Sequence, residues 1–351
     1  MSPSDRAVDA LKAVFPPSAL RARRTEGPHG DMIVSVDDFT DLVVRWLSVG
    51  WPRQVAEALH DQPRPDVLVA PAMSPGARKA AHDAGVGWVD ESGAADIYLR
   101  SPAGTTIVIQ TKGTPPQPLD SRIGWRRTTL AVCEALLAGK ADPNTSSVIE
   151  ATGLSMGSVT AALKFLERDG HLTSEAARGP NSARQIVDRD VLLDAYAIAA
   201  QRLRPPTSIH VGVLWRDPVT EVIEIGRRWC AAGIDWATTS ALSAAVMAPM
   251  QTEIAPMEIY VSGRTPSDLQ RVALAADLPQ IQGGRLVLRP FPTPAVLALT
   301  EKPTAGFQSM LWPRVYADLR TTGVRGEDVA EHLRVTTAST PSARRTTMPR
   351  P

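Results

Sequence analysis

The sequence is poor in cysteine and histidine, which narrows the chemistry it can support. Its two cysteines, Cys133 and Cys230, lie in apolar stretches with helical spacing. We therefore expect buried thiols in a reducing compartment rather than a disulfide framework. The six histidines show no metal-ligand spacing with cysteine or with one another. The sequence accordingly predicts no metal site and no cofactor.

Long apolar runs and a large charge of one sign are also missing. No run reaches the length of a membrane span, and the N-terminus lacks the apolar core of a signal peptide, so we expect a cytoplasmic protein without membrane contact. The formal net charge of +1 argues against a nucleic-acid binder that relies on overall charge, so any DNA binding must use a local patch. With 351 residues, of which 43% are hydrophobic, the chain is expected to fold into two or three domains.

The most informative stretch is residues 148–172, which predicts a helix–turn–helix. A short helix is followed by a tight turn at Thr152-Gly153-Leu154 and by a second helix from about Ser155 to Asp169. Ser155 is a good N-cap because its hydroxyl can accept from an unpaired N–H of the first turn. A buried stripe is expected at helical spacing on one face, formed by Val159, Ala162, Leu163 and Leu166.

A basic-tipped hairpin follows this second helix, over Leu172–Val187. A helix–turn–helix with such a hairpin is typical of winged-helix proteins, in which the second helix lies in the DNA major groove. The face opposite the buried stripe carries small or hydrogen-bonding side chains, and the hairpin carries two arginines. The candidate DNA-binding residues are Ser155, Ser158, Thr160, Lys164 and Arg168 on the helix, with Arg178 and Arg184 on the hairpin.

The same stretch allows a second interpretation. Glu167, Asp169 and Glu175 lie near the expected DNA face, and a helix–turn–helix can also serve protein contact or dimerisation. A protein-interaction module therefore remains an alternative. The pattern of residues 151–170 closely resembles that of bacterial winged-helix regulators, which favours DNA binding.

The N-terminal segment, residues 1–118, alternates expected strands and helices and so predicts an α/β layer. Residues 67–78 and 84–93 resemble the restriction-endonuclease-like domain that precedes a winged helix in some bacterial regulators. An active nuclease of that fold needs an acidic residue on one strand and an acidic-x-Lys triplet on the next, to hold Mg²⁺. This chain has Val44-Arg45-Trp46-Leu47 where the triplet would fall. We expect an inactive scaffold, with a Mg²⁺-dependent nuclease as an alternative.

After a proline-rich linker at Gly113–Asp120, we expect a winged-helix domain over residues 122–203 and a C-terminal α/β domain over residues 208–334. The C-terminal part is similar to the nucleotidyltransferase-like region of AbiEi-type antitoxins, in three pieces: Ser240–Ala245, Val315–Leu319 and Arg325–Ala330. A working nucleotidyltransferase needs a Gly-Ser turn and two carboxylates at i and i+2. Here Thr239-Ser240-Ala241 and Glu258-Ile259-Tyr260 stand instead, so we expect no nucleotidyl transfer, although this activity also stays an alternative.

These expectations describe a multidomain α/β protein with an endonuclease-like domain, a winged helix–turn–helix and a nucleotidyltransferase-like domain. Residues 335–351 lack an apolar period and are expected to be disordered. The resemblance implies a bacterial, antitoxin-like transcriptional regulator that is not an enzyme and binds double-stranded DNA. The resemblance also allows two further partners, a toxin or other protein and a second protomer.

Overall fold

The structure is a computed structural model. It describes residues 2–15, 20–24, 31–36, 40–100, 106–114, 124–174, 184–250, 254 and 257–339. They form two compact units, one comprising Met1–Leu119 with Gly323–Arg325 and the other Asp120–Thr322 with Gly326–Pro351. The chain is therefore a multidomain α/β protein, as the sequence predicts. Among the described helices, none combines the length and the apolar character that crossing a membrane requires.

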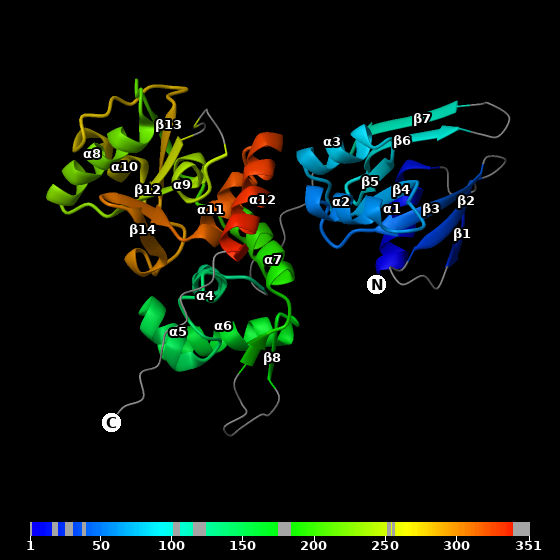
Figure 1. Cartoon of the computed structure of the whole chain (residues 1–351), viewed down its shortest axis with the longest axis horizontal. Helices are drawn as coiled ribbons and strands as arrows, with labels where there is room; N and C mark the ends of the chain where they lie inside the picture. Colours follow the sequence, from blue (N-terminus) through cyan, green and yellow to red (C-terminus); the bar gives the residue numbers. More distant parts are fainter. Residues whose placement is uncertain are drawn as a thin grey trace. The chain divides into compact units, whose positions relative to one another are not determined.

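The first unit contains one sheet flanked by helices (Figure 1). Its elements are α1 (Pro3–Val14), β1 (Leu20–Arg24), β2 (Met32–Val36), β3 (Thr40–Trp46), α2 (Pro52–His60), β4 (Val67–Ala70), α3 (Pro75–Asp83), β5 (Gly87–Asp90), β6 (Ala94–Arg100) and β7 (Thr106–Lys112). The strands follow one another across the sheet from β1 to β7. The pairs β3–β4 and β4–β5 are parallel, and the remaining pairs are antiparallel.

Strand β4 explains how this unit builds its core. Val67 and Val69 join the apolar cluster that includes Leu11 of α1. Leu68 and Ala70 join a second cluster with Ala77 of α3. Successive side chains of a strand point to opposite faces, and here both faces are covered. All four residues of β4 are consequently buried, as its continuous apolar sequence predicts.

The second unit begins with the helix–turn–helix region and ends with a six-stranded sheet and two helices (Figure 1). Its first part is α4 (Arg127–Leu137), α5 (Thr145–Thr152), α6 (Met156–Arg168), β8 (Leu172–Ser174), β9 (Arg184–Ile186) and α7 (Arg189–Arg202). Its second part is β10 (Ile209–Val211), α8 (Pro218–Ala231), β11 (Trp236–Thr239), α9 (Ser240–Met247), β12 (Met257–Val261), α10 (Pro266–Leu274), β13 (Leu286–Pro290), the short 3₁₀ helix η2 (Leu297–Leu299), β14 (Thr300–Thr304), β15 (Phe307–Met310), α11 (Trp312–Leu319) and α12 (Val324–Ser339).

The large sheet of this unit has the strand order β10-β13-β12-β11-β15-β14. Met257, Ile259 and Val261 of β12 lie in its main apolar cluster with Trp229 of α8. Glu258 and Tyr260 alternate with them and therefore point to the other face. On that face the Tyr260 hydroxyl donates to Asp318 of α11. The alternation thus separates an apolar side of the strand from a polar one.

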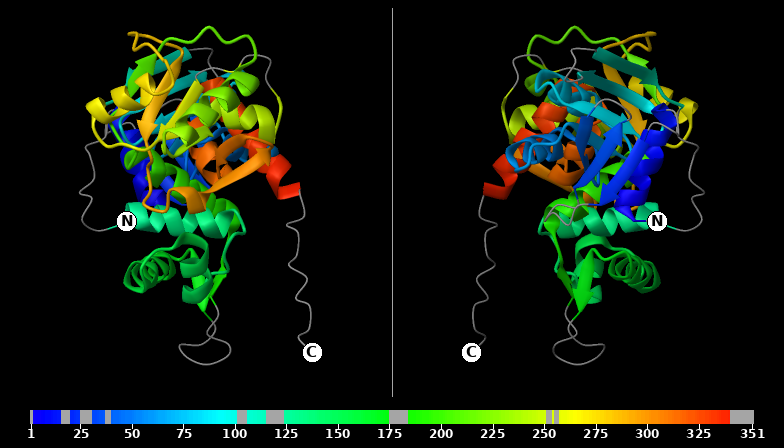
Figure 2. Two further views of the ribbon diagram at one scale, coloured as in Figure 1. Left: turned by 90° about the vertical axis from the view of Figure 1, so that its left-hand side faces the viewer. Right: turned by 90° about the vertical axis from the view of Figure 1, so that its right-hand side faces the viewer.

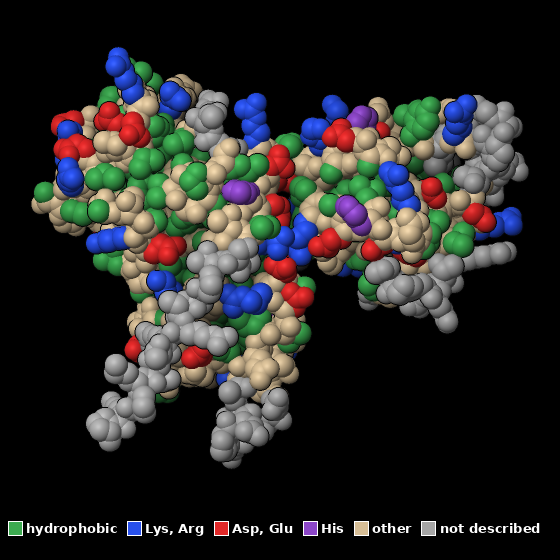
Figure 3. Space-filling view, viewed as in Figure 1, with side chains coloured by type: hydrophobic (Ala, Val, Ile, Leu, Met, Phe, Trp, Pro, Cys, Tyr) green, Lys and Arg blue, Asp and Glu red, His purple; other side chains and the backbone are tan. Residues whose placement is uncertain are grey.

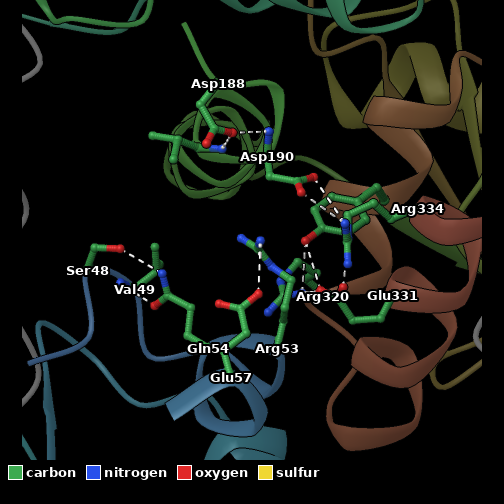
Figure 4. A network of polar contacts seen from close by, with 12 residues as sticks. Ser48, Val49, Arg53, Gln54, Glu57, Asp188, Asp190, Arg320, Glu331 and Arg334 are labelled. Atoms are coloured by element: carbon green, nitrogen blue, oxygen red, sulfur yellow. Dashed lines mark hydrogen bonds and ion pairs between the residues drawn. The ribbon is translucent and has the colours of Figure 1, made fainter. Parts of the chain in front are cut away.

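The structure joins regions that the sequence separates at about residue 205. Helix α7, at the end of the expected winged-helix domain, packs against α11 of the expected C-terminal domain. Asp190 of α7 also pairs with Arg334 of α12 at 3.1 Å (Figure 4). Figure 4 also shows contacts within the first unit, where Gln54 accepts from the backbone N–H of Val49. The two expected domains therefore belong to one compact unit.

Several sequence expectations need correction. Cys133 is buried as expected, but Cys230 is exposed because it lies on the outer side of α8. Helix α12 ends at Ser339, so residues 335–339 of the expected disordered tail are helical, and the rest of the tail lies outside the described residues. Strand β1, whose sequence is rich in arginine, pairs with β2 at the sheet edge. Strands β11, β14 and β15 were also not anticipated.

Candidate nucleic-acid interface

The turn between α5 and α6 has the local geometry that the sequence predicts. Gly153 ends α5 with a left-handed backbone at φ 67°, a conformation that glycine adopts without a steric penalty. Ser155 is the N-cap of α6, and its hydroxyl accepts from the backbone N–H of Ser158 at 3.4 Å. The expected stripe on α6 is buried throughout, at Val159, Ala162, Leu163 and Leu166. In Figures 1 and 2, α5, α6 and β8 lie together at one end of this unit.

The candidate residues on α6 fall on the side away from that stripe. Ser155, Lys164 and Arg168 are exposed, and Ser158 and Thr160 are half-buried. Gly157 and Ala161 lie on the same outward side and are exposed. A helix whose outward face mixes cations with very small residues can bring its backbone close to another molecule. The structure therefore brings together the five helix residues of the predicted site.

The hairpin after α6 is held to the helix by one carboxylate. Both oxygens of Glu167 are engaged: Oε1 accepts from the Ser174 hydroxyl at 2.6 Å, and Oε2 accepts from Nε of Arg184 at 3.1 Å. These two hydrogen bonds hold the pKa of Glu167 below its usual value. Arg184 is thus tied to α6 through Nε, while Arg178 lies outside the described residues. Glu167, which the sequence suggests as an unfavourable charge on a DNA face, instead anchors the wing.

A group of aromatic and basic residues next to α6 was not identified from the sequence. The ring of Trp125 meets Phe165 edge-on with the ring centroids 5.6 Å apart. The Arg168 guanidinium lies 5.6 Å from the centroid of Phe165 on the outward side. Arg126 and Arg127, at the start of α4, are both exposed. The adjacent arginines at an expected helix start were the only sequence signal for this group.

The cations on α6 and at the start of α4 have no carboxylate partner among the described residues. Within the part of the chain that the structure describes, Arg126, Arg127, Lys164 and Arg168 form no ion pair. The positive charge is therefore available to another molecule. It is a local feature, because blue and red side chains are intermixed over the face in Figure 3, in keeping with the net charge of +1.

A hollow of about 650 Å³ lies between the start of α4 and this side of α6. The described residues that line it are Gly124, Arg126, Thr128, Thr129, Gly157, Ser158, Ala161, Ala162, Phe165 and Arg168. Two of them are cations, three carry hydroxyl groups and none is acidic. The hollow is therefore polar and positively charged on its described walls.

The position that would hold a nuclease triplet is filled by a buried arginine. Arg45 is 3% exposed, and its Nε and one terminal nitrogen donate to the two oxygens of Asp31 at 2.7 and 2.9 Å. Its other terminal nitrogen donates to the backbone oxygen of Ala58 and to Asp61. The pKa of Arg45 is raised, mainly by the hydrogen bonds to Asp31. These contacts make Arg45 a structural ion-pair residue.

The carboxylate expected at the nucleotidyltransferase position is likewise paired with arginine. Glu258 is 4% exposed and accepts from Arg204 and, at 3.2 Å, from Nε of Arg289. Ser240, at the turn where a phosphate-binding glycine would stand, is fully buried and has φ 53°. Among the described residues, no group of three or more histidine, cysteine, aspartate or glutamate side chains could hold a metal ion.

Comparison of the chain with protein-family models, with curated proteins and with solved structures gave no match.

Proposed function

We propose that the chain is a cytoplasmic, bacterial DNA-binding regulator that contacts double-stranded DNA through α6 and the β8–β9 wing. One observation carries the proposal. The outward face of a helix–turn–helix presents Lys164 and Arg168 without ion-pair partners among the described residues. Exposed cations on such a helix are the groups that neutralise DNA phosphates and read guanine edges. The antitoxin-like resemblance of the sequence agrees with this role.

In the proposed complex α6 lies in the major groove. The absence of large side chains at Gly157 and Ala161 lets the helix approach closely, while Lys164 and Arg168 reach phosphates or base edges. Thr160 and Ser158 add hydroxyl groups beside them. Glu167 uses only Nε of Arg184, so both terminal nitrogens of that guanidinium remain able to donate to a phosphate. Holding the wing against α6 would present both elements in a fixed geometry.

The ion pairs in the two sheets favour a regulator over an enzyme. The Arg45–Asp31 pair lies where the endonuclease resemblance would put the metal-binding triplet. The Glu258 pairs with Arg204 and Arg289 occupy the carboxylate that a nucleotidyltransferase would use for metal. A buried carboxylate already neutralised by arginine is a poor Mg²⁺ ligand. We therefore assign both sheets a supporting role in DNA binding.

DNA binding by the intact chain across a salt series tests the proposal. A duplex is first selected from a random pool, and affinity is then measured by fluorescence anisotropy for the wild type and for Lys164→Ala/Arg184→Ala. We expect the double variant to bind more than tenfold more weakly, a loss of about 1.4 kcal/mol. The slope of log affinity against log salt should also fall, by about 0.9 for each lost phosphate contact.

A matched control separates the site from general charge. Arg216→Ala/Lys302→Ala also removes two exposed cations from the second unit, but neither belongs to α6 or the wing. Its affinity should stay within about twofold of the wild type, since only long-range attraction is lost. No selected duplex, or equal losses in the two double variants, would show that α6 and the wing are not the binding site. Strand cleavage on addition of Mg²⁺ would support the nuclease alternative instead.

A further inference from the structure

The hollow between α4 and α6 contains the start of a helix whose polar groups lack partners. Leu130 is the first residue of α4 whose N–H bonds within the helix, to the oxygen of Arg126. The N–H groups of Arg127, Thr128 and Thr129 therefore have no acceptor inside the helix. The N-cap residue, Arg126, makes no side-chain capping hydrogen bond. These three N–H groups need an acceptor from elsewhere.

The positive charge at the start of α4 also favours an anionic acceptor. The N-terminus of a helix carries partial positive charge, which acidic residues in the first turn usually offset. The first turn of α4 has no acidic residue and begins with two arginines instead, Arg126 and Arg127. This arrangement is unfavourable in the free protein and becomes favourable when an anion lies at the helix start.

Thr129 gives an independent indication of a ligand in the hollow. Its side chain is only 3% exposed and lines the hollow. No described residue accepts from or donates to its hydroxyl. Since Thr129 lines the hollow, its hydroxyl group is available to a molecule that binds there. An anion in the hollow would accept from this hydroxyl.

Arg168 approaches the same space from α6. Its guanidinium packs over the ring of Phe165, which Trp125 supports from another side. The aromatic contact positions the arginine beside the hollow without using its five N–H donors. The hollow therefore combines a helix start, a buried hydroxyl and two arginines, Arg126 and Arg168, on its described walls.

We propose that this hollow binds one phosphate group, supplied by the backbone of bound DNA. Three backbone N–H groups, the Thr129 hydroxyl and the two arginines can all donate, and the charged oxygens of a phosphate group accept such hydrogen bonds. This inference rests on the proposed function for the source of the phosphate. It adds that α4, a helix outside the helix–turn–helix itself, fixes the position of α6 along the duplex.

Inorganic phosphate and duplex DNA are used as separate probes of the ¹⁵N-labelled intact chain. In the wild type, each should shift the amide resonances of Arg127, Thr128 and Thr129 in a saturable manner. Thr129→Val removes the hydroxyl without changing the side-chain shape, and Thr129→Ser restores it. We expect the valine variant to bind both probes several-fold more weakly and the serine variant to bind them like the wild type. Circular dichroism checks that each variant is folded.

Replacing single phosphates of the selected duplex by uncharged methylphosphonate linkages then identifies the phosphate that occupies the hollow. Arg126→Ala should weaken DNA binding and lower the salt slope by about one, the effect of losing one phosphate contact. A single methylphosphonate at the matching position should weaken the wild type but not this variant. The Arg216→Ala variant serves as the charge-matched control and should behave like the wild type.

The outcomes separate this inference from the proposed function. Unchanged α4 amides with both probes, or full DNA affinity in Thr129→Val and Arg126→Ala, would overturn the phosphate site while leaving DNA binding intact. Shifts with inorganic phosphate in a chain that binds no duplex would overturn both the DNA source and the proposed function. Shifts with both probes that Thr129→Val weakens together would support the inference.

Discussion

Charged residues are used in opposite ways in the two sheets and in the helix–turn–helix. In the first sheet and in helix α11 the pairs are buried, as in Arg45 with Asp31 and Arg314 with Asp318. On α6, Lys164 and Arg168 are exposed, without a carboxylate partner among the described residues. A buried pair neutralises its own charge and leaves none for a ligand, whereas an exposed single cation contributes almost nothing to folding. The difference therefore separates residues that maintain the fold from residues available for recognition.

Breaking a buried pair should give the largest effect. Arg45→Met leaves Asp31 without its two guanidinium donors in a site where both side chains are about 5% exposed. Removing one partner of a buried pair costs about 3–5 kcal/mol. Hydrogen exchange of peptides from β2 and β3 should therefore become much faster. Lys79→Met, which removes an exposed pair with Asp83 in the same unit, is the control and should change exchange little. Similar exchange in the two variants would contradict the structural role of Arg45.

Glu134 sharpens the comparison of buried and exposed charges, because it is a buried carboxyl group that accepts a hydrogen bond from a hydroxyl rather than from an arginine. Its Oε1 accepts from Tyr196 at 2.7 Å, and burial raises its pKa to about 7. In Asp318 burial also acts to raise the pKa, but Arg314 and Arg204 outweigh it and the pKa is lowered. The pKa of Asp318, which is paired with arginine, is thus lowered, and the pKa of Glu134 is raised.

This difference predicts a pH dependence of stability. The unfolded chain releases the Glu134 proton near the ordinary glutamate pKa of 4.5, whereas the folded chain retains it to about pH 7. The contribution is therefore complete below about pH 4.5 and is lost as the pH rises to about 7, by up to roughly 3 kcal/mol. Urea unfolding between pH 5 and 8 should show this loss in the wild type but not in Glu134→Gln. Parallel pH profiles for the two proteins would contradict it.

A smaller loss of stability is expected when the Glu167 carboxylate, which joins α6 to the β8–β9 wing, is replaced. Glu167→Gln keeps the shape of the side chain but weakens its bonds to Ser174 and Arg184, which are partly exposed. The net contribution of such a hydrogen bond to the free energy of unfolding is about 1 kcal/mol. Amides of β8 and β9 should exchange several-fold faster, while those of α4 keep their rates. Glu221→Gln, on the exposed side of α8, serves as the control. Unchanged exchange in the wing would show that Glu167 does not anchor it.

The smallest effect on folding should come from α6 itself. Lys164→Gln and Arg168→Gln remove exposed charges that have no described ion-pair partner, so the unfolding free energy should change by less than about 0.5 kcal/mol. The same variants should weaken DNA binding. A large loss of stability in either variant would remove the distinction between fold-maintaining and available charges.

Local signals in the sequence were enough to locate the helices of the helix–turn–helix. Ser2 and Ser74 cap α1 and α3 as the Ser-Pro pattern of each predicts, and Ser155 caps α6. Gly153 has the positive φ that the expected turn needs. These features depend on neighbours within four residues, which a single sequence displays directly. The buried stripe of α6 was predictable for the same reason.

Features that depend on distant residues were not predictable. Glu167 and Arg184 are separated by the hairpin, so nothing in the sequence marks them as a pair. The Asp31–Arg45 pair requires knowledge of the sheet register. Strands β1 and β14 lie at sheet edges, where one-sided pairing leaves a weaker apolar pattern. The hollow at α4 depends on the packing of α4 against α6, which spacing alone does not reveal.

The packing of α7 on α11 has a consequence for how this chain can change over evolutionary time. Leu193, Tyr196 and Ala200 of α7 are buried. A fragment ending at Arg202 would expose to water the part of α7 that packs on α11. The helix–turn–helix is thus not an independent domain. It and the C-terminal sheet must be inherited, duplicated or exchanged together.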